Sequence, residues 1–187
     1  CGDLQQDCDP GNGLPELAPG GLEQVTAYVQ GLALPPRRNY SDPMAIAGLH
    51  LFKAANCQSC HVPRLQTGST HAIVSYRNKT IEPFTDMLLH DMGDGLADGR
   101  PQFKATGNEW RTPPLWGLSY VKHVLGVPAT CEDPSSGGAE PNFMHDGRAR
   151  SLMEAILWHG GEAEASRSAV LAMDATQRAQ LISFVGY

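Results

Sequence analysis

Five consecutive residues constrain this sequence more than any others: Cys57-Gln58-Ser59-Cys60-His61. Two cysteines three positions apart, followed at once by a histidine, form the attachment sequence of c-type haem. In such a site the two thiols bond to the vinyl groups of the porphyrin and the histidine binds the iron. The motif therefore predicts one covalently attached haem on Cys57 and Cys60, with His61 as the proximal iron ligand.

Other interpretations of a Cys-x-x-Cys pair need a context that this sequence does not offer. A thioredoxin-like redox pair lies near a βαβ pattern, and a structural zinc site needs a second pair of ligands. A buried porphyrin also agrees with the composition, because aromatic residues make up only 7% of a chain that contains 20 Gly and 14 Pro. We therefore expect a loop-rich domain whose core is completed by the cofactor.

Three helical patterns lie before and after the motif. Residues 22–32 carry apolar side chains at helical spacing and precede a Pro-Pro pair that prevents continuation. Ser41 or Asp42 can cap a second helix, which has a proline in its first turn and leads to Cys57. Residues 151–159 begin with a Ser-x-x-Glu capping box and end at two glycines, which predicts a third helix.

A fourth helix is predicted near the C-terminal end of the sequence. It starts at Asp174 or Thr176 and carries its apolar face within residues 181–185. Residues 62–107 are predicted to be mostly loop, and a loop of that length between ordered elements usually wraps a cofactor. We expect the helix before Cys57 to cross the C-terminal helix.

These patterns predict a mainly α fold: a cytochrome c-like haem domain with long loops in residues 41–187, and a lead-in segment 1–40 that forms an N-terminal helical extension. The formal net charge is −6 and the basic residues are scattered, which argues against a nucleic-acid partner. No apolar run is long enough to predict a transmembrane segment. Because thioether attachment of haem takes place outside the cytoplasm, we expect a periplasmic or otherwise extracytoplasmic protein.

A six-coordinate haem needs a second axial ligand, normally His or Met. His159 shares the apolar stripe of its helix with Leu152 and Ile156, at positions i, i+4 and i+7, so it is expected to face the core. A buried imidazole needs a partner, which the iron would supply, but His159 could equally cap the end of its own helix. Met92, in a glycine-rich loop, is the alternative ligand, and the pattern alone leaves the choice open.

Three further residues are candidates for cofactor contacts or proton transfer. Arg111 can pair bidentately with a haem propionate, or it can be an ordinary surface residue before a proline turn. Trp116 can pack on the porphyrin, as Trp110 and Trp158 can, although core packing explains these side chains almost as well. His145 follows Met144 and precedes an aspartate, where it can serve as a distal acid or base or only hydrogen-bond within its loop.

Three cysteines lie outside the haem motif. Cys1 and Cys8 are close together in a turn-rich segment, and a disulfide between them is the preferred interpretation for an oxidising compartment. A lipidated Cys1 is the rival interpretation. Cys131 has no obvious partner and is expected to be a free thiol.

Four blocks, in order along the sequence, resemble the di-haem oxidoreductases, also called thiol oxidoreductases, which are related to the bacterial di-haem cytochrome c peroxidases. The resemblance covers essentially the whole chain. The blocks are the haem motif at 57–61, HDMGDGLADG at 90–99, WRTPPLWG at 110–117, and FMHDGRARSL at 143–152 followed by EAILWHGGE at 154–162.

The resemblance implies two haem domains in the whole protein, of which this sequence matches the carboxyl-terminal one with its lead-in. The chain would then be half of a larger protein, because it contains a single Cys-x-x-Cys-His motif. In the related peroxidases the distal ligand of the second haem occupies the position of His159, which favours His159 over Met92. These peroxidases also hold calcium between their haem domains, so the resemblance allows calcium here, although no clustered carboxylates resemble a dedicated calcium loop.

With both axial positions filled, we expect a single-electron carrier that forms the electron-relay half of a di-haem oxidoreductase. Its partner would be a second haem domain or a redox protein. One alternative is a peroxidase-like enzyme that reduces peroxide at an open haem site, with His145, Glu154 or Glu162 moving protons. Another is a docking subunit of a larger cytochrome assembly.

Overall fold

The computed structural model of the chain describes residues 17–33, 40–125 and 141–186, without the side chains of residues 122–124. Helices predominate among its regular elements, which also include two sheets of two short strands each. The prediction of a mainly helical protein is confirmed at this level. Within the described ranges, no helix is both long and apolar enough to cross a membrane.

The chain divides into two units, residues 1–34 and 35–187, and each is described by itself. The first contains α1 (Gly21–Gln30), which confirms the helix predicted there. The apolar side chains in and just after α1 are exposed, and they are Leu22, Val25, Tyr28, Val29 and Leu32. The boundary that the sequence suggests at residue 40 stays a prediction.

Helix α2 (Pro43–Ala54) delivers the chain to the haem motif, as predicted. Its cap is Asp42, whose carboxylate accepts a hydrogen bond of 2.9 Å from the backbone N–H of Met44. Pro43 occupies the first turn, where its missing N–H costs no hydrogen bond. The motif follows at once, with Cys57–Ser59 forming the single 3₁₀ turn η2.

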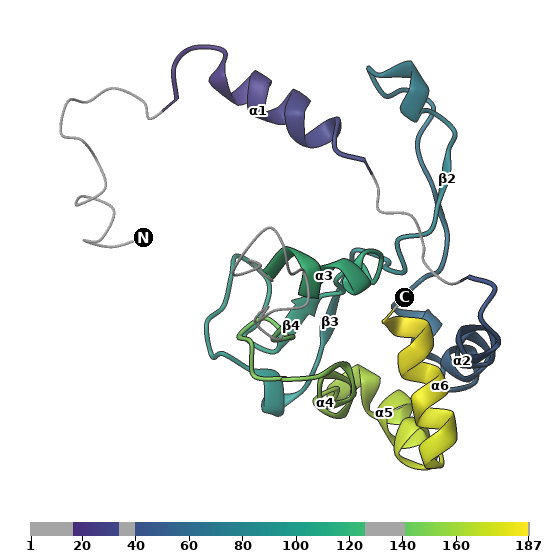
Figure 1. Ribbon diagram of the computed structural model, residues 1–187. Helices are drawn as coiled ribbons and strands as arrows, with labels where there is room; N and C mark the ends of the chain where they lie inside the picture. Colours follow the sequence, from purple (N-terminus) through teal and green to yellow (C-terminus); the bar gives the residue numbers. More distant parts are fainter. Residues whose placement is uncertain (1–16, 34–39, 126–140, 187) are drawn as a thin grey trace, which may run out of the picture. The chain divides into compact units, whose positions relative to one another are not determined.

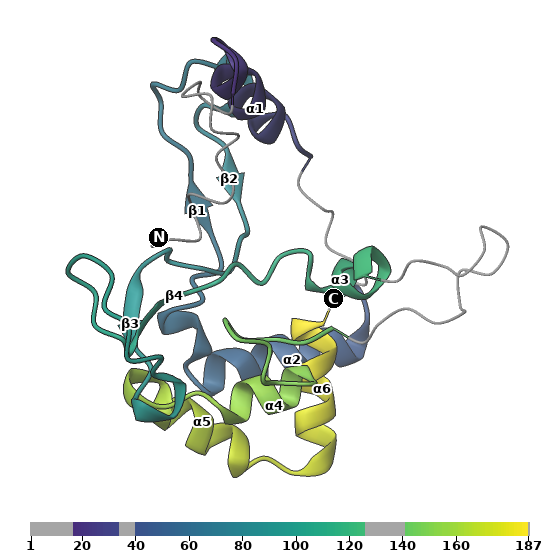
Figure 2. The ribbon, with the colours of Figure 1, turned by 90° about the vertical axis from the view of Figure 1, so that its left-hand side faces the viewer.

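Helix α6 (Ala175–Val185) begins at a complete capping box, in which the side chains of Asp174 and Gln177 each accept from the other's backbone N–H. Figure 1 and Figure 2 show α2 and α6 side by side, which confirms the predicted pairing of these two helices. Gly48 lies at their contact. A Cβ there would overlap the carbonyl oxygen of Gln180 and lie 2.7 Å from the Cβ of Phe184.

Substituting Gly48→Ala is therefore expected to destabilise the second unit, although alanine is the better helix former. Overpacking a core costs about 1–3 kcal/mol, and the obstacle here includes rigid backbone. The higher helix propensity of alanine, relative to glycine, stabilises the helix by only about 1 kcal/mol. Denaturant unfolding should show a net loss of up to about 2 kcal/mol, toward the upper end because backbone cannot move aside. Gly68→Ala is the matched control, because a Cβ at Gly68 meets nothing within 4 Å, and an equal loss there would contradict the close-packing explanation.

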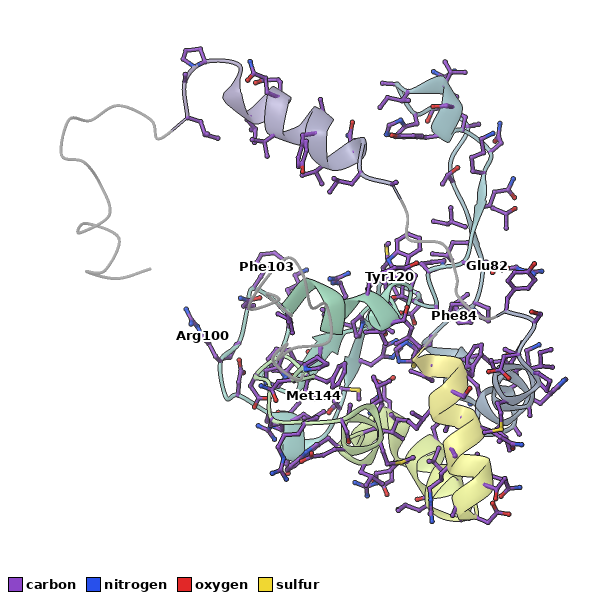
Figure 3. The ribbon with its side chains drawn as sticks, in the orientation of Figure 1. Glu82, Phe84, Arg100, Phe103, Tyr120 and Met144 are labelled. Atoms are coloured by element: carbon purple, nitrogen blue, oxygen red, sulfur yellow. The ribbon has the colours of Figure 1, made fainter. Side chains whose placement is uncertain are left out.

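The core beside the haem motif is built on three phenylalanines. The ring centroid of Phe52 on α2 lies 5.1 Å from that of Phe184 and 6.1 Å from that of Phe84. Phe84 lies beside the C-terminal end of α6 (Figure 3), with its ring centroid 5.5 Å from that of Phe184. The Phe52 ring is also 6.4 Å from the imidazole of His61. Through Phe52, the α2–α6 pair thus packs beside His61, the predicted proximal ligand.

The long segment after the motif contains short elements that the sequence pattern predicts only as loop. Antiparallel strands β1 (Leu65–Gln66) and β2 (Thr80–Ile81) form one sheet, and β3 (Leu89–Asp91) and β4 (Glu109–Arg111) form the other. The 3₁₀ turns are η3 (Val74–Tyr76) and η4 (Asp94–Leu96). Strands of two or three residues are too short to show an alternating pattern. Phe103, in the loop before β4, is almost fully exposed (Figure 3).

Three more helices complete the second unit: α3 (Leu118–Leu125), α4 (Leu152–Leu157) and α5 (Glu164–Leu171), with the 3₁₀ turn η5 (Gly161–Ala163) before α5. α4 begins at the predicted cap, Ser151, but it ends two residues before His159. Only half of the predicted capping box forms, because the carboxylate of Glu154 accepts instead from the N–H of Arg150. α5 was not predicted, since Val170 is its one fully buried residue and the apolar signal is weak.

Candidate functional site

The haem motif is held as a tight turn by its own backbone. The N–H of His61 donates to the carbonyl of Cys57 at 3.0 Å, and both thiols are free. Burial raises the pKa of the Cys57 thiol to about 11 and also raises that of Cys60. Redox-active pairs rely on a lowered thiol pKa, so this environment argues against a thioredoxin-like role. Cys1, Cys8 and Cys131, with their predicted states, lie outside the described residues.

His61 is oriented by a hydrogen bond between its Nδ1 and the carbonyl of Phe84, at 3.0 Å. A carbonyl can only accept, so Nδ1 carries the proton and Nε2 carries the free lone pair. Burial lowers the pKa of His61 to about 4, which keeps the imidazole neutral near pH 7. A neutral ring with its other nitrogen fixed to a carbonyl is the usual arrangement of a histidine ligand.

The carbonyl that orients His61 is itself held in place. Phe84 has a left-handed backbone conformation, with φ of 54°, which is unusual for a side chain of this size. The next two residues are tied to the motif, because Thr85 N–H donates to Val62 and Asp86 N–H donates to Cys60. Such strain persists where the surroundings fix it, and it is common at functional sites.

The other imidazole, His159, follows α4. Its Nδ1 lies 2.8 Å from the carbonyl of Ala155, one turn earlier, so this histidine also donates from Nδ1 and keeps its lone pair on Nε2. Burial lowers the pKa of His159 too. The two interpretations from the sequence, a helix-end hydrogen bond and a ligand, are therefore compatible, because they use different nitrogens of the same ring.

His61 and His159 lie close to each other although they are 98 positions apart in the sequence. Their ring centroids are 6.5 Å apart and their planes are inclined by 45°. Two metal–imidazole bonds of about 2 Å, with about 1 Å from each nitrogen to its ring centre, give roughly 6 Å between the centroids of two axial imidazoles. The observed spacing agrees with two axial ligands of one iron.

A cavity of about 420 Å³ joins these side chains, which falls within the range of roughly 300–1,000 Å³ usual for cofactor sites. Its lining includes Cys57, Cys60, His61 and His159. Its apolar lining side chains come from α2, the 96–118 segment and the C-terminal helices, and they include Phe52, Leu96, Leu115, Leu118, Leu152, Ile156, Val170 and Leu181. Thiols, imidazoles and an apolar wall around one cavity fit a porphyrin.

Most of the other predicted residues lie at the same cavity. Met92 and Arg111 both line it, and Arg111 is exposed, as a partner for a propionate at the cavity edge should be. Trp116 is only partly buried and is not among the lining residues, so the structure does not bring it to the predicted cofactor contact. Trp110 does line the cavity, and its indole N–H donates to the carbonyl of Leu96 at 3.1 Å.

His145 also lines the cavity, where it stacks on Trp110 with a centroid separation of 3.5 Å and an angle of 13°. Its neighbour Met144 lines the same cavity and has a left-handed φ of 70°. Asp146 forms an ion pair of 2.6 Å with Arg148, which holds this loop. Sequence reasoning named His145 but missed the stacking, because it joins residues far apart in the chain.

Three polar side chains beside the cavity were not predicted as a group. The imidazole of His90 lies between the carboxylates of Asp86 and Glu162, at 2.8 Å from each. A different set of three, in which Cys60 replaces Glu162, is the one group among the described residues whose side chains are close enough to share a metal ion: Cys60, Asp86 and His90. This set of thiol, carboxylate and imidazole differs from the all-oxygen sets that calcium prefers, so it gives calcium no support.

The fold and this site define a mainly helical protein in which one cavity brings together two thiols and two imidazoles, the residue types that hold haem. Comparison with known families agrees. The sequence matches the family described as "Di-haem oxidoreductase, putative peroxidase" over residues 6–187, which is nearly the whole chain, and the chain belongs to that family. No curated protein and no solved structure matches it significantly.

Proposed function

We propose that this chain is a c-type cytochrome domain that serves as the electron-relay half of a di-haem oxidoreductase. One observation carries the proposal: the imidazoles of His61 and His159 lie 6.5 Å apart at one cavity, each with Nε2 available. Together they would hold the iron of a haem bound in this cavity. A site filled in this way favours electron transfer over binding of a small substrate.

When bound, haem supplies reversible one-electron chemistry. Cys57 and Cys60 would hold it covalently, and the carbonyls of Phe84 and Ala155 orient the two imidazoles. The apolar side chains of the cavity would limit the access of water to the bound group. Arg111, at the cavity edge, is placed to pair with a propionate.

The proposal includes a cytochrome c-like fold and a partner that exchanges electrons with this chain. The α2–α6 pair beside the Cys-x-x-Cys-His turn supports the fold. The family is a di-haem family and the sequence has one haem motif, which supports a second haem domain as the partner. Thioether attachment supports a periplasmic or otherwise extracytoplasmic location. Calcium stays an expectation from the resemblance alone.

A peroxidase-like enzyme is the second candidate function, and the His145–Trp110 stack at the cavity favours it. There His145 would move the proton. The two glutamates considered from the sequence are less suited, because the carboxylate of Glu154 is engaged by Arg150 and that of Glu162 by His90 and Asp91. Peroxide would also have to displace His159.

Rapid mixing of the reduced chain with two oxidants separates these functions. With ferricyanide, a one-electron oxidant that needs no open iron site, we expect oxidation of the haem within the mixing time. With hydrogen peroxide we expect oxidation to be slower by orders of magnitude, because His159 blocks the iron. Equally fast oxidation by peroxide, with repeated turnover, would favour the peroxidase-like function instead.

A further inference from the structure

The backbone of the turn that follows His159 packs closely against strand β3 and the residues just after it. Gly161 has a left-handed φ of 51°, and a Cβ there would overlap the carbonyl oxygen of Asp91. A Cβ on Gly160 would lie 2.9 Å from the carbonyl oxygen of Met92. Glycine is thus required at both positions, and the backbone after His159 has no room to shift toward β3.

The side chain of Glu162 fastens this turn. Its Oε1 accepts from the backbone N–H of Asp91 at 3.0 Å, and its Oε2 lies 2.8 Å from Nδ1 of His90. Both contacts are to β3, which lies 71 and 72 positions earlier in the sequence. Glu162 therefore links β3 to the residues directly after His159 by two hydrogen bonds, which we call the tie.

His90 extends the tie toward the haem motif. Its Nε2 lies 2.8 Å from the carboxylate of Asp86, so both ring nitrogens face carboxylates and both must donate. This arrangement favours the protonated imidazole, and the hydrogen bond to Glu162 raises the pKa of His90, with Asp86 adding to the rise. The N–H of Asp86 in turn donates to the carbonyl of Cys60 at 2.9 Å.

A continuous series of hydrogen bonds thus connects Cys60 to Asp86, Asp86 to His90, and His90 to Glu162 in the turn after His159. We propose that Glu162 is a positioning residue, which, through His90, holds His159 at the spacing from His61 that a single iron requires. The inference rests on the proposed function, in which His159 is the distal ligand. Glu162 acts on the ligand through the backbone turn rather than by touching the iron.

The test uses the haem-loaded chain and the spin state of its oxidised iron, which reports whether His159 remains bound. Glu162→Ala removes both acceptors of the tie. We expect part of the iron to become high-spin, and the affinity for added imidazole to rise about 10-fold, comparable in size to the lower end of the losses that follow mutation of a partner of a metal ligand. Glu162→Gln keeps an acceptor for Asp91 and should retain most of the low-spin signal.

Glu164→Ala is the matched control. Its carboxylate is as exposed as that of Glu162, at 51% against 56%, and it pairs with Arg167 on its own helix. We expect its spectrum to equal that of the unmodified chain. His90→Ala breaks the same tie from the side of β3 and gives a second measurement if Glu162→Ala folds poorly. A smaller shift in the same direction is expected there, since Asp91 still donates to Glu162.

The outcomes separate this inference from the function it rests on. An unmodified chain with a bis-histidine spectrum, together with Glu162→Ala and His90→Ala variants that keep that spectrum and the same imidazole affinity, would overturn the positioning role alone. An unmodified chain with no bis-histidine spectrum would overturn the proposed function and this inference with it.

Discussion

Replacing both Cys57 and Cys60 by alanine is expected to abolish covalent haem attachment completely. The two thiols are the only groups of the motif that can form thioethers, and both line the cavity as free thiols. A denaturing gel stained for haem should show a strong band for the unmodified chain and none for the double variant. Each single variant should keep at most one thioether, which the absorption spectrum of the alkaline pyridine complex distinguishes.

Cys131→Ala is the control for this experiment, because it removes a cysteine outside the motif. Its haem content should match that of the unmodified chain. Covalent haem on the double variant would show that another residue carries the attachment, and it would remove the basis for a c-type cytochrome domain.

Replacing His159 by alanine is expected to convert the oxidised iron from low-spin to high-spin, because the imidazole opposite His61 is lost. The change should be nearly complete, since the imidazole of His159 lies 6.5 Å from that of His61 at the same cavity, a spacing that suits a shared iron. The variant should bind cyanide and imidazole readily, whereas the unmodified chain should bind them weakly. Added imidazole should restore the low-spin spectrum by filling the vacated position.

Met92→Ala is the matched variant, because Met92 lines the same cavity and is the alternative ligand. Its backbone N–H donates to Asn108, and this bond survives the substitution. We expect its spin state to be unchanged. A low-spin spectrum in His159→Ala that is lost in Met92→Ala would reverse the assignment and make methionine the distal ligand.

Local signals in the sequence predicted several elements well. The sequence offered Ser41 or Asp42 as the cap of α2 and Asp174 or Thr176 as the start of α6, and in the structure Asp42 and Asp174 are the caps. These signals work because a cap involves residues only two or three positions apart. The resemblance that favoured His159 is consistent with its position near His61, although ligation itself stays a prediction.

Other features depend on contacts between distant residues and left no local signal. The tie between Glu162 and His90 joins residues 72 positions apart, and neither side chain lies in a pattern that identifies its partner. The stack of His145 on Trp110 and the pairing of β3 with β4 are of the same kind. The sequence offers Trp110 and Trp116 alike for the cofactor, and only the fold determines that Trp110 lines the cavity and Trp116 does not.

Low-temperature electron paramagnetic resonance of the oxidised, haem-loaded chain tests the central claim most directly. The method reports the spin state of the iron and the class of its axial ligands without a substrate. We predict a purely low-spin signal of the bis-histidine type, because His61 and His159 both have Nε2 available at one cavity. A substantial high-spin signal would mean an open iron site and would contradict the electron-relay function.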